Sequence, residues 1–237
     1  MSRGRMLSIF AGLALLLFSE RAGATPVVIV GNFGPPPSYR SDAGWAVLGP
    51  ASQGGHFSSV AMPFSPAIDD YQLLDIDIAL EFANGTNSAM VTLNADSSGL
   101  PGAVLLQWTL TGLPAFGSCC MVQTLTPSSP LVLSSGAHYW IVASPGAADT
   151  FAVWNWNNVG ASGLIASNDG SGFLVSGPNT IGAFAVVGEP LERGTAVPEP
   201  ATALISAVGL MLLGRRRAQM RIRSFVGLSK LVDRFHR

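Results

Sequence analysis

The sequence feature that most constrains the fold is a strict alternation of apolar and polar residues between Leu74 and Phe82. Apolar side chains fill every second position, and three of the four intervening positions are acidic, namely Asp75, Asp77 and Glu81. Because successive side chains of a β-strand point to opposite faces of the sheet, this run predicts one half-buried strand with an acidic outer face. Asn84-Gly85 then predicts a turn.

Similar short runs follow one another through most of the chain, separated by turns rich in Gly, Pro, Asn and Ser. Strands of this length, with turns about every 8–12 residues, predict an all-β fold, an antiparallel β-sandwich with a jelly-roll-like arrangement. We expect the runs 74–82, 89–96 and 103–110 to form an antiparallel meander. The other predicted strands are 27–30, 44–48, 57–64, 121–125, 138–144, 151–155, 164–166, 173–176 and 183–187.

Near the C-terminus, Val197 and Pro198-Glu199-Pro200 precede an uncharged apolar run, Ala201–Leu213, which leads to Arg215, Arg216 and Arg217. The run is shorter than the ~20 residues that span a bilayer comfortably. It could still cross if the bilayer thins or the arginines snorkel, and the basic cluster then marks the cytoplasmic end. A buried core helix is the alternative.

The order of these three parts resembles the PEP-CTERM sorting signal, which joins a Pro-Glu-Pro motif, a hydrophobic transmembrane helix and a basic cluster. The resemblance implies recognition by an exosortase and cleavage near Pro198-Glu199-Pro200. Since proline restricts its own backbone and that of the preceding residue, this entrance should stay extended and accessible to a protease.

The chain departs from the PEP-CTERM pattern because residues 218–237 follow the arginine cluster. This tail is basic, and its apolar residues recur mostly at steps of three and four, which indicates an amphipathic helix on the inner membrane surface. A disordered tail that is removed with the signal is the alternative.

The N-terminus carries Arg3 and Arg5, an apolar stretch from Met6 to Phe18 and the small-residue pattern Ala22-Gly23-Ala24. These are the three parts of a secretory signal peptide, with cleavage after Ala24. The predicted organisation is therefore a signal peptide (1–24), a β-sandwich domain (25–192), a sorting segment (193–217) and a tail (218–237).

The near-neutral total charge hides an acidic exported segment. Residues 25–197 carry eleven acidic residues against two basic ones, Arg40 and Arg193, which is a formal net charge of −9. Such a surface argues against nucleic acid as a partner, because phosphate binding needs a basic face. It also argues against direct binding of anionic polysaccharide.

Short motifs across residues 30–188 resemble the choice-of-anchor domains of bacterial surface proteins, most closely the R type. The resemblance implies a fold and transfers no catalytic residue. The motifs are Asn32-Phe33-Gly34, Gly44-Trp45, Tyr71-Gln72-Leu73, Ser97-Ser98-Gly99-Leu100-Pro101-Gly102, Pro114-Ala115-Phe116-Gly117 and His138-Tyr139-Trp140.

Cys119 and Cys120 are the only cysteines, and they are adjacent. In an oxidising compartment they could form a vicinal disulfide. Free or mixed thiols and an intermolecular bridge are the alternatives, and the CxxC spacing of metal and redox sites is absent.

Motifs of the common hydrolases and metalloenzymes are missing, and His56 and His138 are the only histidines before the tail. Asp75 and Asp77, about 7 Å apart on one strand face, could serve a glycosidase or a calcium ion, but solvation of an exposed sheet is the simpler interpretation. We therefore expect no catalytic residues, no metal and no cofactor.

Trp154 and Trp156 point to one face if residues 151–155 form a strand. Exposed together, the two indoles could stack on a sugar, and if they lie in the core this prediction fails. We expect a non-enzymatic surface or extracellular-matrix protein of a Gram-negative bacterium, with exosortase and membrane as partners. A carbohydrate-binding module for exopolysaccharide is the alternative.

Overall fold

Antiparallel β-strands are the regular secondary structure of the region that the structure, a computed structural model, describes: residues 25–191. Every pairing between its named strands is antiparallel, which confirms the predicted all-β class and is consistent with a β-sandwich. The predicted signal peptide with its cleavage site at Ala22 and Ala24, the sorting segment (193–217) with its motif residues Val197 to Arg217, and the tail all lie outside the described residues.

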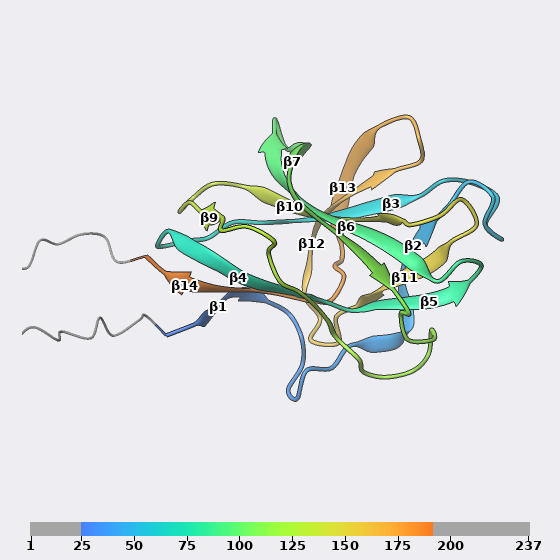
Figure 1. The fold of residues 1–237 in the computed structure, drawn as a ribbon, viewed down its shortest axis with the longest axis horizontal. Coiled ribbons are helices and arrows are strands. Elements are labelled where there is room, and N and C mark those ends of the chain that lie inside the picture. The colour runs from blue at the N-terminus through green and yellow to red at the C-terminus, as the bar shows by residue number, and fades with distance from the viewer. Residues whose placement is uncertain (1–24, 192–237) are drawn as a thin grey trace, which may run out of the picture. The chain divides into compact units, whose positions relative to one another are not determined.

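One sheet has five strands, with β1, β14, β4 and β8 as successive neighbours and β9 also paired with β4. In Figure 1, β1, β14 and β4 lie side by side in the lower part of the domain. Their bounds are β1 (Val27–Gly31), β14 (Phe184–Pro190), β4 (Tyr71–Ile78), β8 (Gln123–Leu125) and β9 (Val132–Leu133).

A second sheet has six strands in the order β13, β12, β3, β10, β6 and β7, and a third has three in the order β2, β11 and β5. Figure 1 shows β3, β10 and β6 of the six-stranded sheet above β4 and β14. The bounds are β13 (Phe173–Thr180), β12 (Ser162–Asn168), β3 (Ser59–Phe64), β10 (Tyr139–Pro145), β6 (Ser88–Ser97), β7 (Leu100–Thr111), β2 (Arg40–Leu48), β11 (Phe151–Trp156) and β5 (Leu80–Asn84).

The main hydrophobic core draws fully buried side chains from all three sheets. Ile76 comes from the five-stranded sheet, Leu93 and Ile141 from the six-stranded sheet, and Leu80 and Trp154 from the three-stranded sheet. Removing this apolar area from water contributes roughly 25 cal/mol per Å² to the folding free energy. The apolar residues at alternate strand positions therefore hold the sheets together.

The prediction of one strand from Leu74 to Phe82 is wrong. The run breaks at Ala79, so that β4 belongs to the five-stranded sheet and β5 to the three-stranded sheet. Backbone bonds explain the break, because the Ala79 N–H donates to Ala183 O and the Ala79 carbonyl accepts from the Asn155 N–H. A chain that crosses between sheets at a bend makes a corner of this kind.

The predicted meander is also wrong in its first member, because β6 pairs with β7 and β10, whereas β5 pairs with β11.

The first and last strands of the described region are neighbours, since Val27 of β1 is paired with Gly188 of β14. Within residues 25–191 no helix is long and apolar enough to cross a membrane.

Candidate functional site

The two tryptophans predicted as a sugar platform do not form one, because Trp154 has no exposed surface. Its indole packs edge-on against Phe184 with ring centroids 6.3 Å apart, and its Nε1 donates to Ala183 O at 3.1 Å. Gly182 makes room for this ring, since a Cβ there would lie 2.5 Å from Trp154 Nε1. The condition for sugar stacking, that Trp154 and Trp156 are exposed together, is therefore not met.

Trp156 follows a shift in the register of β11 against β2, between Asn155 and Trp156. It is partly buried, packs edge-on against Trp45 at 5.9 Å, and has the Arg40 guanidinium 5.7 Å from its ring centroid. A single indole covered by these neighbours cannot stack on a sugar as a pair would.

Both faces of β11 are covered. The sequence analysis assumed that one face of this strand is buried and the other exposed, and neither face is exposed. Trp154 faces the main core, yet Val153 is 5% exposed and Asn155 is 0% exposed. Neither polar atom of the Asn155 amide has a hydrogen-bond partner among the described residues. The second face therefore holds a buried polar cluster.

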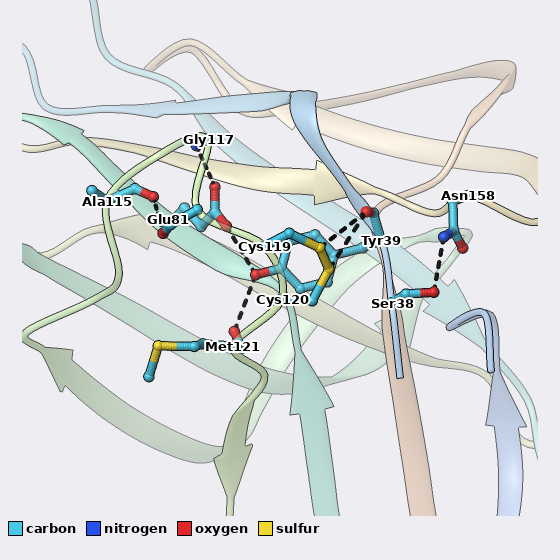
Figure 2. Close-up of a disulfide and its surroundings, with 10 residues drawn as sticks. Ser38, Tyr39, Glu81, Ala115, Gly117, Cys119, Cys120, Met121 and Asn158 are labelled. Carbon is cyan, nitrogen blue, oxygen red and sulfur yellow. Dashed lines mark hydrogen bonds between the residues drawn. A yellow bond between two sulfur atoms is a disulfide. The ribbon is translucent and has the colours of Figure 1, made fainter. Parts of the chain in front are cut away.

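Glu81 is completely buried and is the centre of a hydrogen-bonded cluster with Tyr39 and Gly117. It is paired with Val153 of β11, on the face away from the main core. Figure 2 shows its two oxygens bound from different directions: the Tyr39 hydroxyl donates to Oε1 at 2.9 Å, and the Gly117 N–H donates to Oε2 at 2.9 Å. A buried carboxylate needs such donors, because an unpaired charge away from water is very unfavourable.

Tyr39 lies just before β2 and is 4% exposed. Burial raises the pKa of its hydroxyl well above the ordinary value, and the hydrogen bond to Glu81 and the negative charge of Glu81 raise the pKa further. The hydroxyl oxygen also lies 3.3 Å from Met121 O. Tyr39 thus stays protonated and joins Glu81 to the loop that follows Gly117.

That loop, residues 113–122, carries a disulfide between Cys119 and Cys120. The structure therefore has one of the alternatives left open by the sequence. Figure 2 places the two sulfurs beside Tyr39, whose carbonyl oxygen is 3.9 Å from Cys119 Sγ and 3.8 Å from Cys120 Sγ. Cys119 is exposed, whereas Cys120 packs with Phe33 and Val122 against a small cluster that includes Tyr39.

Asp75 and Asp77 lie on the outer face of the five-stranded sheet, each opposite a threonine of β8 or just beyond it. Thr126 Oγ1 donates to Asp75 Oδ1 at 2.7 Å, and Thr124 Oγ1 donates to Asp77 Oδ1 at 2.6 Å. Among the described residues no group of three or more His, Cys, Asp or Glu could hold a metal ion. The two carboxylates are partly buried and anchored across the strand pair.

Beside Asp77 the outer face of this sheet is hollowed into a groove of about 360 Å³. Its floor comes from β1, β14 and β4, and its walls come from the 33–37 turn and from β8 with the residue before it. Phe33 and Val122 belong both to this wall and to the cluster around Tyr39. The buried Glu81 cluster therefore supports one side of the groove.

Two further polar side chains hold turns. Asn168 Oδ1 accepts from the N–H groups of Gly170 and Gly172. Asp96 accepts from Trp140 Nε1 at 2.7 Å and from the Gly99 N–H at 2.9 Å, and these bonds, the first above all, hold the pKa of its carboxyl below the usual value. His56 is exposed in the segment between β2 and β3, and His138 is exposed just before β10.

No model of a known protein family and no curated protein matches this chain. The candidate site therefore rests on geometry alone: a buried Tyr39–Glu81 pair, a loop with a vicinal disulfide, and a groove ending at Asp77. Of these, the sequence analysis named the two cysteines and the Asp75–Asp77 pair. It missed the burial of Glu81, for which the only sequence signal is the small Ala79 that interrupts the acidic positions.

Proposed function

We propose that the protein is an exported structural component of the cell surface or extracellular matrix of a Gram-negative bacterium. An exosortase would recognise its C-terminal sorting segment, and the β-sandwich, of jelly-roll-like form, would be the part that remains outside. The observation that carries the proposal is the order of the Pro198-Glu199-Pro200 motif, the apolar run and the arginine cluster, behind an N-terminal signal peptide.

The described domain supports this proposal in two ways. Its entry and exit strands are neighbours, with Val27 paired to Gly188, which suits a domain held by a segment that follows it. Its residues also include ten acids and one base, Arg40, which forms an ion pair with Asp42 at 3.0 Å. A high net charge of one sign keeps an exposed protein soluble.

Alanine substitution of Pro198-Glu199-Pro200 in the natural host tests the proposal. We expect the full-length variant to be retained in the membrane, whereas the wild type is processed to a shorter form. Alanine substitution of Ser128-Ser129-Pro130, which are exposed between β8 and β9, is the matched control and should be processed normally. Unchanged size and release of the Pro-Glu-Pro variant would show that the sorting proposal is wrong.

The carbohydrate-binding alternative has lost one of its two residues, because Trp154 is buried. A glycan array with the wild-type protein and a Trp156→Ala variant tests it independently of sorting. Binding that the variant loses would restore that alternative.

A further inference from the structure

The groove on the five-stranded sheet has an apolar floor because small residues lie between larger ones. Gly31 of β1 is paired with Ala185 of β14, and a Cβ on Gly31 would come within 3.1 Å of Ala185 Cβ and 3.1 Å of Val28 Cγ1. Val28, which also lines the groove, is 62% exposed. The absence of a side chain on Gly31 thus opens a slot with apolar walls.

One end of this slot is polar and negatively charged. Asp77 and Thr124 both line it, and Thr124 Oγ1 already donates to Asp77 Oδ1. No hydrogen bond within the described residues reaches Asp77 Oδ2, although a carboxylate oxygen accepts readily. No basic side chain lines the groove, and Arg40, the only base among residues 25–191, is bound to Asp42. The slot therefore suits a cation carried on an apolar stem and disfavours anions.

We propose that this groove binds a lysine side chain of a partner polypeptide, with the ammonium group on Asp77 Oδ2 and the methylene stem along Val28 and Phe33. Lysine matches because it buries its stem while its charged end makes point-like hydrogen bonds. Arginine matches less well, since its planar fork binds a carboxylate through both oxygens, and Thr124 already uses one acceptor position of Oδ1.

The lysine comes from outside the described domain. Residues 25–191 contain no lysine, so a second copy of this domain cannot supply the side chain. One wall of the groove is fixed before any partner arrives, because Phe33 and Val122 also pack against the Tyr39 cluster. The inference does not depend on the sorting proposal, because it concerns the folded domain alone.

The test titrates the exported protein with the peptide acetyl-Leu-Lys-Leu-amide and follows backbone amide shifts by NMR at low ionic strength. We expect shifts centred on β1, β14 and β8, and at least fivefold weaker binding by Asp77→Asn and by Gly31→Val. Asp75→Asn, which removes a charge on the same face but outside the groove, is the matched control and should change the affinity less than twofold. Circular dichroism of each variant checks that it folds.

Three further ligands decide the chemistry. The same peptide with acetylated lysine should not bind, acetyl-Leu-Arg-Leu-amide should bind more weakly, and n-butylammonium should bind at least tenfold more weakly than the lysine peptide. The proposal is wrong if the acetylated peptide binds equally, if the arginine peptide binds more tightly, or if n-butylammonium binds as well as the peptide. It is also wrong if Asp75→Asn weakens binding as much as Asp77→Asn, which would indicate diffuse attraction to an acidic surface, or if no peptide binds.

Discussion

Three acidic residues take alternate positions of one run: Asp75 and Asp77 before Ala79, and Glu81 after it. Their environments are nevertheless opposite. The two aspartates lie on a partly open sheet face, each with one threonine donor. Glu81 has no exposed surface and is bound by Tyr39 and Gly117. Alternation thus indicates which side chains avoid the main core, but it does not say what covers the second face.

The covering elements explain the difference. A loop bearing the disulfide and the residues before β2 close over the outer face of the three-stranded sheet at Glu81. On the five-stranded sheet the corresponding elements, Phe33 and Val122, lie at the side of the groove and leave Asp77 at its end. The same kind of residue therefore anchors a loop in one place and offers a binding site in the other.

Replacing Glu81 should produce the largest effect of any acidic residue in this run. Glu81→Ala leaves the Gly117 N–H without its acceptor and the Tyr39 hydroxyl with only the longer contact to Met121 O, and it opens a cavity. Together these losses should cost about 3–5 kcal/mol of unfolding free energy. Urea denaturation measures it. Asp77→Ala is the matched control, with an expected cost of at most about 1 kcal/mol for one lost hydrogen bond. Equal losses in the two variants would mean that Glu81 is not the anchor described.

Tyr39→Phe should have the second largest effect, because it removes one donor to a charged acceptor and little else. Such hydrogen bonds contribute about 1.5–3 kcal/mol. Tyr71→Phe, at a tyrosine whose hydroxyl does not donate to Glu81, is a comparison variant and should lose less.

The pKa of Tyr39 adds a pH signature to that variant. Because the pKa is raised on folding, the unfolded hydroxyl ionises near its ordinary pKa of about 10 while the folded one stays protonated. The contribution of Tyr39 to stability is therefore complete below that pH and is lost as pH rises above it. Tyr39→Phe should flatten the decline of the unfolding free energy between about pH 9 and 11. An unchanged slope would contradict the raised pKa.

These predictions show where the sequence is informative and where it is not. The period of two identified the strands and the all-β class, because burial of one strand face requires it. It could not locate the corner at Ala79, since a switch of sheet keeps the alternation intact and only the backbone bonds to Ala183 and Asn155 reveal it. The groove was equally inaccessible, because Gly31, Phe33 and Asp77 come from segments that only the sheet pairing brings together.

Removing the disulfide should matter less than removing Tyr39. The bond between Cys119 and Cys120 joins neighbours in the sequence, so it closes almost no loop and restricts the unfolded chain very little. The double variant Cys119→Ala/Cys120→Ala should lose less than about 1 kcal/mol, mainly from the packing of Cys120. A loss larger than that of Tyr39→Phe would show that the disulfide, rather than the Glu81 hydrogen bonds, holds the covering loop.

The smallest effect is expected on the open face. Asp75→Asn and Asp77→Asn keep an Oδ1 acceptor for Thr126 and Thr124 and remove one negative charge each from a domain with ten acids and one base. The unfolding free energy should change by no more than about 0.5 kcal/mol, with a slight gain at low salt that disappears as salt screens the repulsion between acids. Glu81→Gln is the comparison variant, because it places an amide among donors that require an acceptor. It should lower the unfolding free energy more than the two Asn variants do, at every salt concentration. If both kinds of variant behaved alike, the covered and the open face would not differ in the way that their contacts imply.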